Sequence, residues 1–473
     1  MKKEQPHLDE SSPQTVTEFI PIHNGRQRIK IGFTDQRLSP HAGLSSFAGF
    51  LHRQRLKDQL AGLMPQRTSP NAQPAADLAL GYVVGVLAGA KKLAQVGFLR
   101  GDPVLPPLLG IDRMPSASSL SRLFGQFGSA QQNNHCFGPL WRWCLGRLSS
   151  KPGGYTLDLD TTHLLHEQAL GKEGVRLGHT PKGLRRCFHP LLGMIAEAKL
   201  VVGFWLRPGN TRCDNNVVAF TRQLLGQLPG YIRVGLVRAD SGFFEEQWLQ
   251  LLEALRLAYI VVGRLHEPLR QLISRQTRWE PTELAGTEVA EEHYQAWSWG
   301  CRRRVILIRH RLAERPQAGG KLLVDCPGYA HQVLVTSLPP TVGPLQVWRA
   351  YNGRAGSEKV IRELDECFAL PQICLEKFYA TEAALSLAVL SYNLCVLFQR
   401  YLGWQERVRA TTLRFRLFST GGIISRSGGY TTLRLAVRAG PLRAWWARVF
   451  EKIVCPIRNC VAVDSHPPAL GFL

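Results

Sequence analysis

The stretch Tyr155-Thr-Leu-Asp158-Leu-Asp160-Thr-Thr162 has the pattern of a hydrophobic β-strand that ends in acidic residues. A second stretch, Val234-Gly-Leu-Val-Arg-Ala-Asp240-Ser-Gly-Phe243, repeats this pattern further along the chain. Apolar strand patterns alternate with helical patterns around both, which predicts a mixed α/β core with ligands bound at the strand ends. Asp160 and Asp240 are therefore candidate functional residues.

A third candidate acid lies in the stretch Tyr351-Asn-Gly-Arg-Ala-Gly-Ser-Glu358. At 100° per residue, a single helix would gather a charged stripe within about 80° of arc, opposite an apolar face. That stripe consists of Tyr351, Arg354, Glu358, Arg362 and Asp365. By itself such a stripe is typical of a solvated helix surface. The two strands that end in Asp favour a functional site instead.

These motifs resemble the DDE transposases of bacterial insertion sequences, and they are most similar to the insertion-sequence-1380 group. In that family the first Asp has a D-x-T context, as Asp160 does, and the second has a strand-D-x-G-F context, as Asp240 does. The third acid is the Glu of Y-(2)-R-(3)-E-(6)-K, whose spacing Glu358 shares. Asp365 stands where the family has Lys, and Arg362, one turn after Glu358, is the candidate replacement.

The resemblance covers about residues 38 to 450 and implies a ribonuclease-H-like catalytic core that uses two divalent ions, Mg²⁺ or Mn²⁺. Two such ions stabilise the attacking and leaving oxygens of an in-line displacement at phosphorus. Asp160 would bridge both ions, Asp240 would complete one, and Glu358 the other. Asp158 points to the same strand face as Asp160 and is a possible supporting ligand.

The same resemblance implies a role for the basic and phenolic residues near Glu358. Arg354 would clamp a phosphate oxygen, and Tyr351 would hydrogen-bond a phosphate or position the helix. The implied activity is cut-and-paste transposition of DNA from terminal inverted repeats through a hairpin intermediate. Two alternatives remain: a ribonuclease-H-like nuclease without strand transfer, and an inactive DNA-binding descendant of a transposase.

Composition agrees with a nucleic-acid partner. Lys and Arg exceed Asp and Glu by 58 − 36 = 22 in this 473-residue chain, which creates a field that attracts polyanions. We expect double-stranded DNA, both transposon ends and target, to be the partner of a homodimer. From Arg400 to Arg448 there are ten arginines and a single acid, Glu406, which indicates a DNA-facing or dimer-facing extension.

The cysteines and the apolar stretches predict a cytoplasmic protein with no membrane contact, and the resemblance implies a bacterial, nucleoid-associated one. Eleven cysteines without a CxxC pair do not form a disulfide framework or a structural zinc site. The most apolar stretch, Leu78 to Ala90, is 13 residues long, too short to span a bilayer. His163 and His166 are either metal ligands near Asp160 or ordinary loop residues.

The patterns along the chain predict five parts: a flexible tail (1–37), a helical DNA-binding region (38–150), a catalytic domain (151–263 and 345–400), a β-rich insertion domain (264–344) and an Arg-rich C-terminal region (401–473). We expect Asp77 to cap an apolar helix that runs through Leu93. Residues 115–124 have a hydroxyl-capped helix start, and residues 382–402 have the pattern of an amphipathic helix packed on the catalytic sheet.

The insertion contains Trp297, Trp299 and the run Arg302, Arg303 and Arg304. Two tryptophans beside three arginines suit stacking on an unpaired base, with phosphate contacts alongside. An aromatic cross-strand pair with a solvated basic edge is the alternative.

Overall fold

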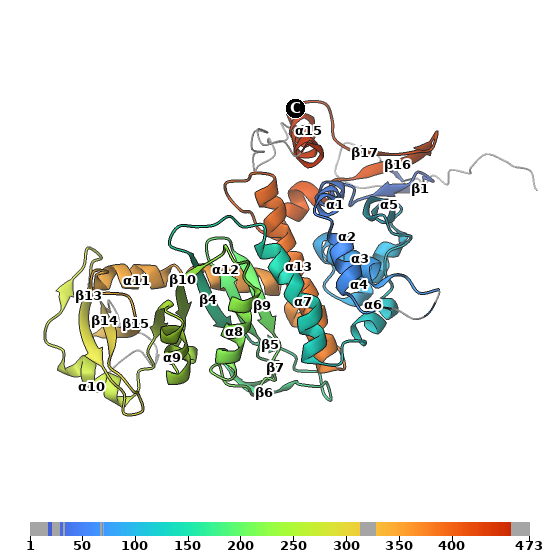
Figure 1. Ribbon diagram of the computed structural model, residues 1–473. Coiled ribbons are helices and arrows are strands. Elements are labelled where there is room, and N and C mark those ends of the chain that lie inside the picture. The colour runs from blue at the N-terminus through green and yellow to red at the C-terminus, as the bar shows by residue number, and fades with distance from the viewer. Residues whose placement is uncertain are drawn as a thin grey trace, which may run out of the picture.

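The computed structural model describes residues 18–20, 29–31, 34–66, 69, 71–312 and 328–455, and its centre is a nine-stranded mixed sheet (Figure 1). The strand order is β12-β13-β14-β15-β11-β10-β4-β8-β9. An antiparallel meander forms one half: β4 (Tyr155–Thr161), β8 (Leu191–Ile195) and β9 (Leu200–Trp205). Two parallel strands follow β4 on its other side: β10 (Val234–Ala239) and β11 (Ala258–Val262).

The segment expected to form an insertion domain extends this sheet. It contains α10 (Glu267–Arg275), β12 (Glu280–Pro281), β13 (Thr287–Tyr294), β14 (Arg303–Arg311) and β15 (Tyr329–Thr336). β15 pairs antiparallel with β11, and β14 and β13 continue outward. The insertion strands and the catalytic strands therefore share one hydrogen-bonded sheet.

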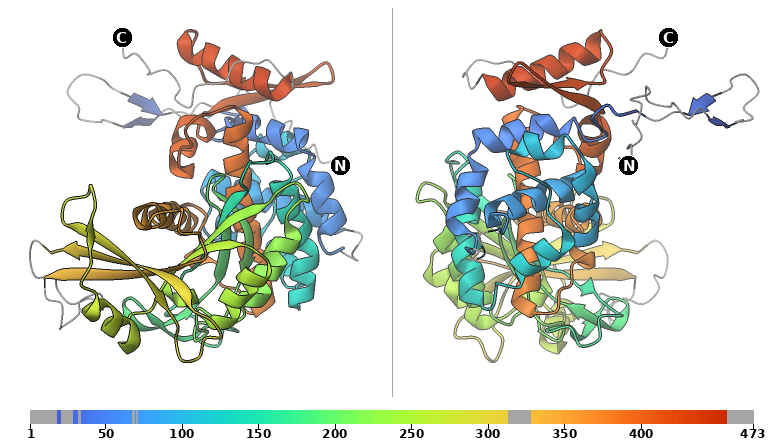
Figure 2. Two further views of the ribbon diagram at one scale, coloured as in Figure 1. Left: turned by 60° about the vertical axis from the view of Figure 1, so that its left-hand side comes forward. Right: turned by 90° about the vertical axis from the view of Figure 1, so that its right-hand side faces the viewer.

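Helices cover both faces of the sheet. On one face lie α8 (Val217–Gln227) and α9 (Glu246–Ala254). α8 packs closely because Gly193 and Gly203 lack a Cβ, which at either position would lie within 2.4 Å of the Leu224 side chain. On the other face lie α11 (Pro344–Asn352) and α12 (Ala355–Cys367), over the strands that present the acids (Figure 2).

One helix, α13 (Phe378–Tyr401), joins the sheet to the N-terminal helices. Asn393 both donates to and accepts from the backbone of Val201 at the sheet edge, at 2.7 and 2.9 Å. The expectation of an amphipathic helix is wrong, because every residue from Ala380 to Gln399 is buried, so no face is left for solvent. α13 is long and apolar enough to cross a membrane, but its apolar window is fully buried inside the protein.

The N-terminal helices form a bundle around α13 (Figure 2). They are α1 (Leu44–Arg53), α2 (Leu56–Leu63), α3 (Ala75–Ala88), α4 (Leu93–Phe98), α5 (Leu105–Leu109), α6 (Ala117–Phe124) and α7 (Ala130–Leu145), with a 3₁₀ turn at Leu99–Gly101. The hydroxyl cap is confirmed, since Ser116 accepts from the amide of Ser119 at 3.0 Å.

Asp77 does not cap α3, and α3 does not reach Leu93. Pro74 is the N-cap residue, and Asp77 follows it in the first turn of the helix. There Asp77 is buried and forms an ion pair with Lys57 at 2.8 Å. The helix ends at Ala88 because Gly89 adopts a φ of 111°, and Leu93 begins α4.

The C-terminal region lies at the end of the molecule opposite the hairpin of β6 (Arg176–Thr180) and β7 (Gly183–Phe188) (Figure 1). It contains α14 (Ala410–Leu413), a π-helix (Arg414–Phe418), β16 (Gly422–Ser427), β17 (Tyr430–Leu435) and α15 (Pro441–Val454). β16 pairs with β3 (Leu38–Ser39), and α15 contacts α1, so segments from the N-terminal and C-terminal parts of the described chain meet here.

The expected flexible tail lies largely outside the described residues. Its described parts include β1 (Glu18–Ile20) and β2 (Ile29–Ile31), which form an antiparallel pair. Along the chain, the segment that connects β4 to β8 forms a further small sheet. Its strands are β5 (Leu164–Leu165), β6 (Arg176–Thr180) and β7 (Gly183–Phe188). Two other 3₁₀ turns lie at Ser241–Phe243 and Leu370–Gln372.

Candidate active site

Asp160 and Asp240 come together at the carboxyl ends of two neighbouring parallel strands, β4 and β10. Nη2 of Arg354 lies 2.8 Å from Oδ1 of Asp160 and 4.0 Å from Oδ2 of Asp240. Backbone amides fix both carboxylates, since Thr161 N donates to Asp160 and Gly242 N donates to Asp240, each at 2.8 Å. The two acids thus face a common point that a cation occupies.

Burial governs the protonation of this cluster. Desolvation raises the pKa of Asp160 to about 6, against the attraction of Arg354, and the neighbouring charge of Asp240 adds to the rise. Desolvation also raises the pKa of Tyr351 to about 12, so its phenol stays protonated beside Arg354. Nε of Arg354 is buried and has no hydrogen-bond partner among the described residues. The cluster therefore holds two carboxylates, one guanidinium and a phenol able to donate a hydrogen bond.

Asp158 has a different role from the one its position predicts. Its carboxylate is fully buried and accepts from Arg238 Nε at 2.7 Å, from Arg238 Nη2 at 2.9 Å and from Ser357 Oγ at 2.6 Å. With these partners and no exposed surface, the carboxylate is not available as a supporting metal ligand. Asp158 instead connects β10 and α12 to β4.

The charged stripe does not lie on one continuous helix. α11 ends at Asn352 and α12 begins at Ala355, with Arg354 at the N-cap. Arg238 reaches this break and donates through Nη1 to the Ala350 carbonyl. A Cβ on Gly353 would lie 2.6 Å from that Nη1 atom, so a glycine is needed here for the guanidinium to approach.

Glu358 lies in the first turn of α12, exposed, and one residue after Ser357. The structure therefore brings the motif of Glu358 to the face that carries Asp160, through the bond between Ser357 and Asp158. Within residues 34–66, 71–312 and 328–455, no three His, Cys, Asp or Glu side chains converge at metal-binding distance. Asp160 and Asp240 are in place, whereas Glu358 does not converge with them.

The position that is Lys in the resembling family is half-buried. Desolvation raises the pKa of Asp365 to about 7, with a contribution from Glu366, and its Oδ1 has no partner among the described residues. Arg362 is exposed on the same helix. Near neutral pH, Asp365 thus carries less negative charge than an exposed Asp.

The insertion residues separate into buried and exposed groups, which corrects two expected DNA contacts. Arg303 is buried between Glu246 and Glu253, at 2.6 and 2.7 Å, and Arg304 pairs with Glu291 at 2.6 Å. Neither guanidinium is free for a phosphate, because these ion pairs and backbone carbonyls take up their donors.

The two tryptophans and Arg302 differ in the same way. Trp299 is buried against Phe244 and Tyr294, with centroids 5.4 Å apart in each case. Trp297 is 96% exposed, and Arg302 is exposed with one bond to the His293 carbonyl. Trp297 and Arg302 are the members of this group that remain accessible to DNA.

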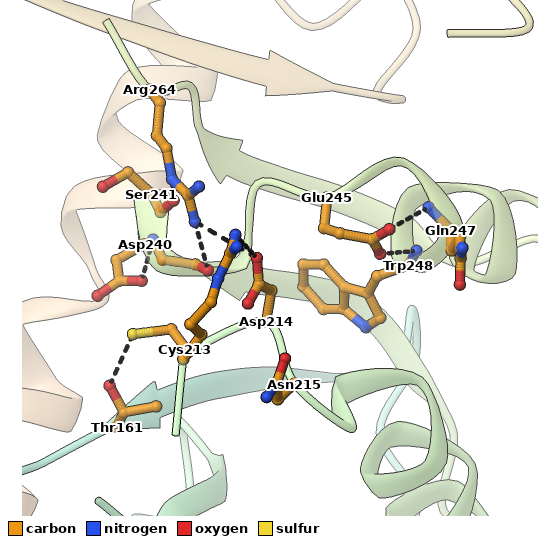
Figure 3. Close-up of polar contacts among 12 residues, drawn as sticks. Thr161, Cys213, Asp214, Asn215, Asp240, Ser241, Glu245, Gln247, Trp248 and Arg264 are labelled. Atoms are coloured by element: carbon orange, nitrogen blue, oxygen red, sulfur yellow. Dashed lines mark hydrogen bonds and ion pairs between the residues drawn. The ribbon is translucent and has the colours of Figure 1, made fainter. Parts of the chain in front are cut away.

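Sequence reasoning missed the residues around Asp240 that Figure 3 shows. The Sγ atom of Cys213 lies 3.7 Å from Oγ1 of Thr161 (Figure 3). On its other side Cys213 lies against Gly242, where an added Cβ would be 2.8 Å from the Cβ of Cys213. Arg264 donates to the carbonyls of Ser241 and Gly242 at 2.9 and 3.1 Å. The sequence offered one signal of buried polar contacts near Asp240. It was Arg238, a charged residue inside an apolar strand pattern.

The model of the family described as "Transposase DDE domain group 1" matches residues 22–455, almost the whole described chain. The chain belongs to this family of DDE transposases. It is accordingly a DDE-type enzyme that acts on DNA phosphodiesters, and DDE transposases use divalent metal ions. A comparison with curated proteins gave no match.

Among solved structures, the chain is similar to a cryo-EM structure of the piggyBac transposase synaptic complex with hairpin DNA. The two share 12% sequence identity, and the superposition covers 81% of this chain and 82% of that chain at a TM-score of 0.42.

Proposed function

We propose that the protein is an insertion-sequence transposase of the insertion-sequence-1380 type, which binds terminal inverted repeats and moves DNA by cut-and-paste. The convergence of Asp160 and Asp240 on one cationic nitrogen of Arg354 carries this proposal. The order β9-β8-β4-β10-β11 supports a ribonuclease-H-like core, because three antiparallel strands are followed by two parallel ones. We propose residues 151–263 and 345–400 as the catalytic part and residues 264–344 as an insertion that extends its sheet from β11.

The residues present fit divalent metal ions. Two carboxylates already share a cation at 2.8 and 4.0 Å, and hard divalent cations prefer carboxylate oxygens. Asp160, Asp240 and Glu358 would hold two Mg²⁺ or Mn²⁺ ions, which when bound stabilise the attacking and leaving oxygens of phosphoryl transfer. Asp158 is excluded from this set by its ion pair with Arg238.

The other residues of the cluster position the DNA backbone. Nε of Arg354 has no hydrogen-bond partner among the described residues, and we propose that the Arg354 guanidinium turns to a phosphate oxygen of the scissile strand when DNA is bound. Tyr351 remains a phenol over the working pH range and donates to a neighbouring phosphate. Arg362 and Arg302 are exposed cations for flanking phosphates.

The remaining charged surface serves binding and assembly. Some of the C-terminal arginines are structural: Arg407 and Arg409 pair with Glu363 and Glu366 of α12, and Arg414 donates to three backbone carbonyls. We propose that the exposed ones, together with the helices of 38–150, contact DNA or a second protomer of a homodimer. The nine described cysteines are free thiols, which fits a cytoplasmic, nucleoid-associated protein.

The proposed triad is tested by single substitutions in the full-length protein. Asp160→Asn, Asp240→Asn and Glu358→Gln should each abolish Mg²⁺-dependent cleavage of an end-containing duplex and leave DNA binding nearly intact, since they remove metal ligands and not phosphate contacts. Glu366→Gln is the matched control, because it lies on the same helix as Glu358 and loses only an exposed ion pair.

The outcomes separate the candidate functions. Retained cleavage in any of the three variants would show that the triad is wrong. Cleavage without joining of the ends to a target duplex would favour the nuclease without strand transfer. Binding without cleavage by the wild-type protein, in either Mg²⁺ or Mn²⁺, would identify the inactive DNA-binding descendant.

A further inference from the structure

A cleft of about 500 Å³ opens beside the two aspartates and has no part in the scheme above. One wall is the β6–β7 hairpin, and the other is the loop of residues 209–213 that follows β9. Cys213, which lines the cleft, contacts Thr161 next to Asp160 and lies against Gly242, two residues after Asp240 (Figure 3). The cleft therefore adjoins the side of the two aspartates that carries Thr161 and Gly242.

The hairpin wall presents an exposed apolar surface. The register pairs His179 with Leu184, and Leu177 lies two residues before His179, so their three side chains share one face. Leu177 is 53% exposed and Leu184 is 59% exposed, so two large apolar side chains lie together at the surface. His179 is exposed between them. We call this exposed face of Leu177, His179 and Leu184 the platform.

The opposite wall carries positive charge. Arg212 is 71% exposed and uses one nitrogen to pair with Asp214 at 2.7 Å, so other guanidinium donors point to solvent. Arg264 lines the same cleft and is 45% exposed. The hairpin itself, residues 176–188, has four cations and no acid. The cleft thus combines an apolar platform with phosphate-binding cations, which is the composition of single-strand DNA sites.

We infer that the cleft between the β6–β7 hairpin and residues 209–213 binds an unpaired nucleotide of the DNA strand that passes Asp160 and Asp240. The base lies on the platform of Leu177, His179 and Leu184, and Arg212 contacts its phosphate. This inference rests on the proposed function, because it requires DNA at the aspartates. It adds a subsite built from other elements than the one that carries Trp297, which lies in the β13–β14 connection.

The test is DNA binding by the full-length protein without divalent metal, so that cleavage does not interfere. The probes are a blunt duplex and the same duplex with a short single-stranded overhang, 3′ or 5′, that carries 2-aminopurine. The wild type should bind one overhang more tightly than the blunt duplex and quench its 2-aminopurine. Leu177→Ala/Leu184→Ala should lose about fivefold in affinity for that overhang, since one stacked base contributes of this order, with the blunt duplex unaffected.

Leu255→Ala is the matched control, an exposed leucine in the connection between α9 and the amino end of β11, whereas Asp240 follows the carboxyl end of the neighbouring parallel strand β10. Arg212→Gln should reduce the salt dependence of overhang binding by about one phosphate contact. The inference is overturned if the wild type does not distinguish the overhang, or if the double variant binds it as the wild type does. The inference is also overturned if the double variant changes its oligomeric state in light scattering but keeps its affinity for the overhang. If the wild-type protein does not cleave DNA when metal is added, the proposed function is refuted, independently of the result for overhang binding.

Discussion

Two acids two residues apart on one strand should respond in opposite ways to the same substitution. In Asp158→Asn, the guanidinium of Arg238 stays buried without its counter-charge, and the 2.6 Å bond from Ser357 to a charged acceptor is weakened. Breaking a buried ion pair by removing one partner costs about 3–5 kcal/mol. That is a large share of the roughly 5–15 kcal/mol by which native proteins are stable.

Asp160→Asn should leave the fold stable. Its pKa of about 6, raised from 3.8, means that burial already disfavours the charged carboxylate in the folded protein. This difference corresponds to about 3 kcal/mol at pH values above 6, and a neutral Asn is free of that penalty. We therefore expect the unfolding midpoint of Asp160→Asn to lie at or above that of the wild type, while Mg²⁺-dependent cleavage is lost.

Unfolding in guanidinium chloride at pH 7.5, followed by tryptophan fluorescence and circular dichroism, distinguishes the Asp158 variant from the Asp160 variant. Arg238→Gln and the double variant Asp158→Asn/Arg238→Gln complete a thermodynamic cycle. The double variant should lose less stability than the sum of the single variants, by about 0.5–3 kcal/mol, because it removes both buried charges. If Asp158→Asn unfolds at the wild-type midpoint and loses only cleavage, then Asp158 is a metal ligand and the reasoning from its burial fails.

Further predictions concern helix α12, the insertion and DNA affinity. Asp365→Asn should match the wild type in stability near pH 4 and exceed it at pH 8, because the wild-type folded state holds a proton up to about pH 7 and loses stability as the pH rises from about 4 to 7; a parallel pH profile of the two melting curves would contradict this. Gly353→Ala should lower the melting temperature and the cleavage rate together, since its Cβ would meet Arg238, and wild-type values of both would show that the close approach is not needed. Trp297→Ala should leave first-strand nicking unchanged and reduce hairpin formation by an amount consistent with about 1–3 kcal/mol of stacking, read from a denaturing gel of a labelled end, whereas Trp299→Ala should destabilise the protein; hairpins at the wild-type rate in Trp297→Ala would refute the assignment. Affinity for duplex DNA should fall steeply with salt, with a slope of about −0.9 per neutralised phosphate, and a flat titration would count against DNA as the partner.

Local patterns in the sequence determined several elements and the placement of Asp160 and Asp240 at strand ends. A hydrophobic strand pattern that ends in an acid predicts β4 and β10, and parallel neighbours bring such ends to one edge of the sheet. The hydroxyl before Ala117 predicts a helix start because the cap bond is formed within four residues. These predictions hold because the interactions that decide them lie close together in the chain.

The helix boundaries near Asp77 and Arg354 could not be predicted in the same way. Helical periodicity continues through Gly89 and Gly353, but a positive φ ends the helix at the first glycine, and the approach of Arg238 breaks it at the second. A periodic pattern records which positions face the core. It does not record a distant side chain that takes up a carbonyl of the helix, as Arg238 does with Ala350.

Only the tertiary structure decided which charged residues are free to act. By sequence, Asp158 is as good a metal ligand as Asp160, and Arg303 is as good a DNA contact as Arg302. In the folded chain Asp158 meets Arg238, 80 residues away, and Arg303 meets Glu246, 57 residues away. The physical reason is that burial forces a charge to find a partner, and that partner is chosen by the packing of strands and helices remote in sequence.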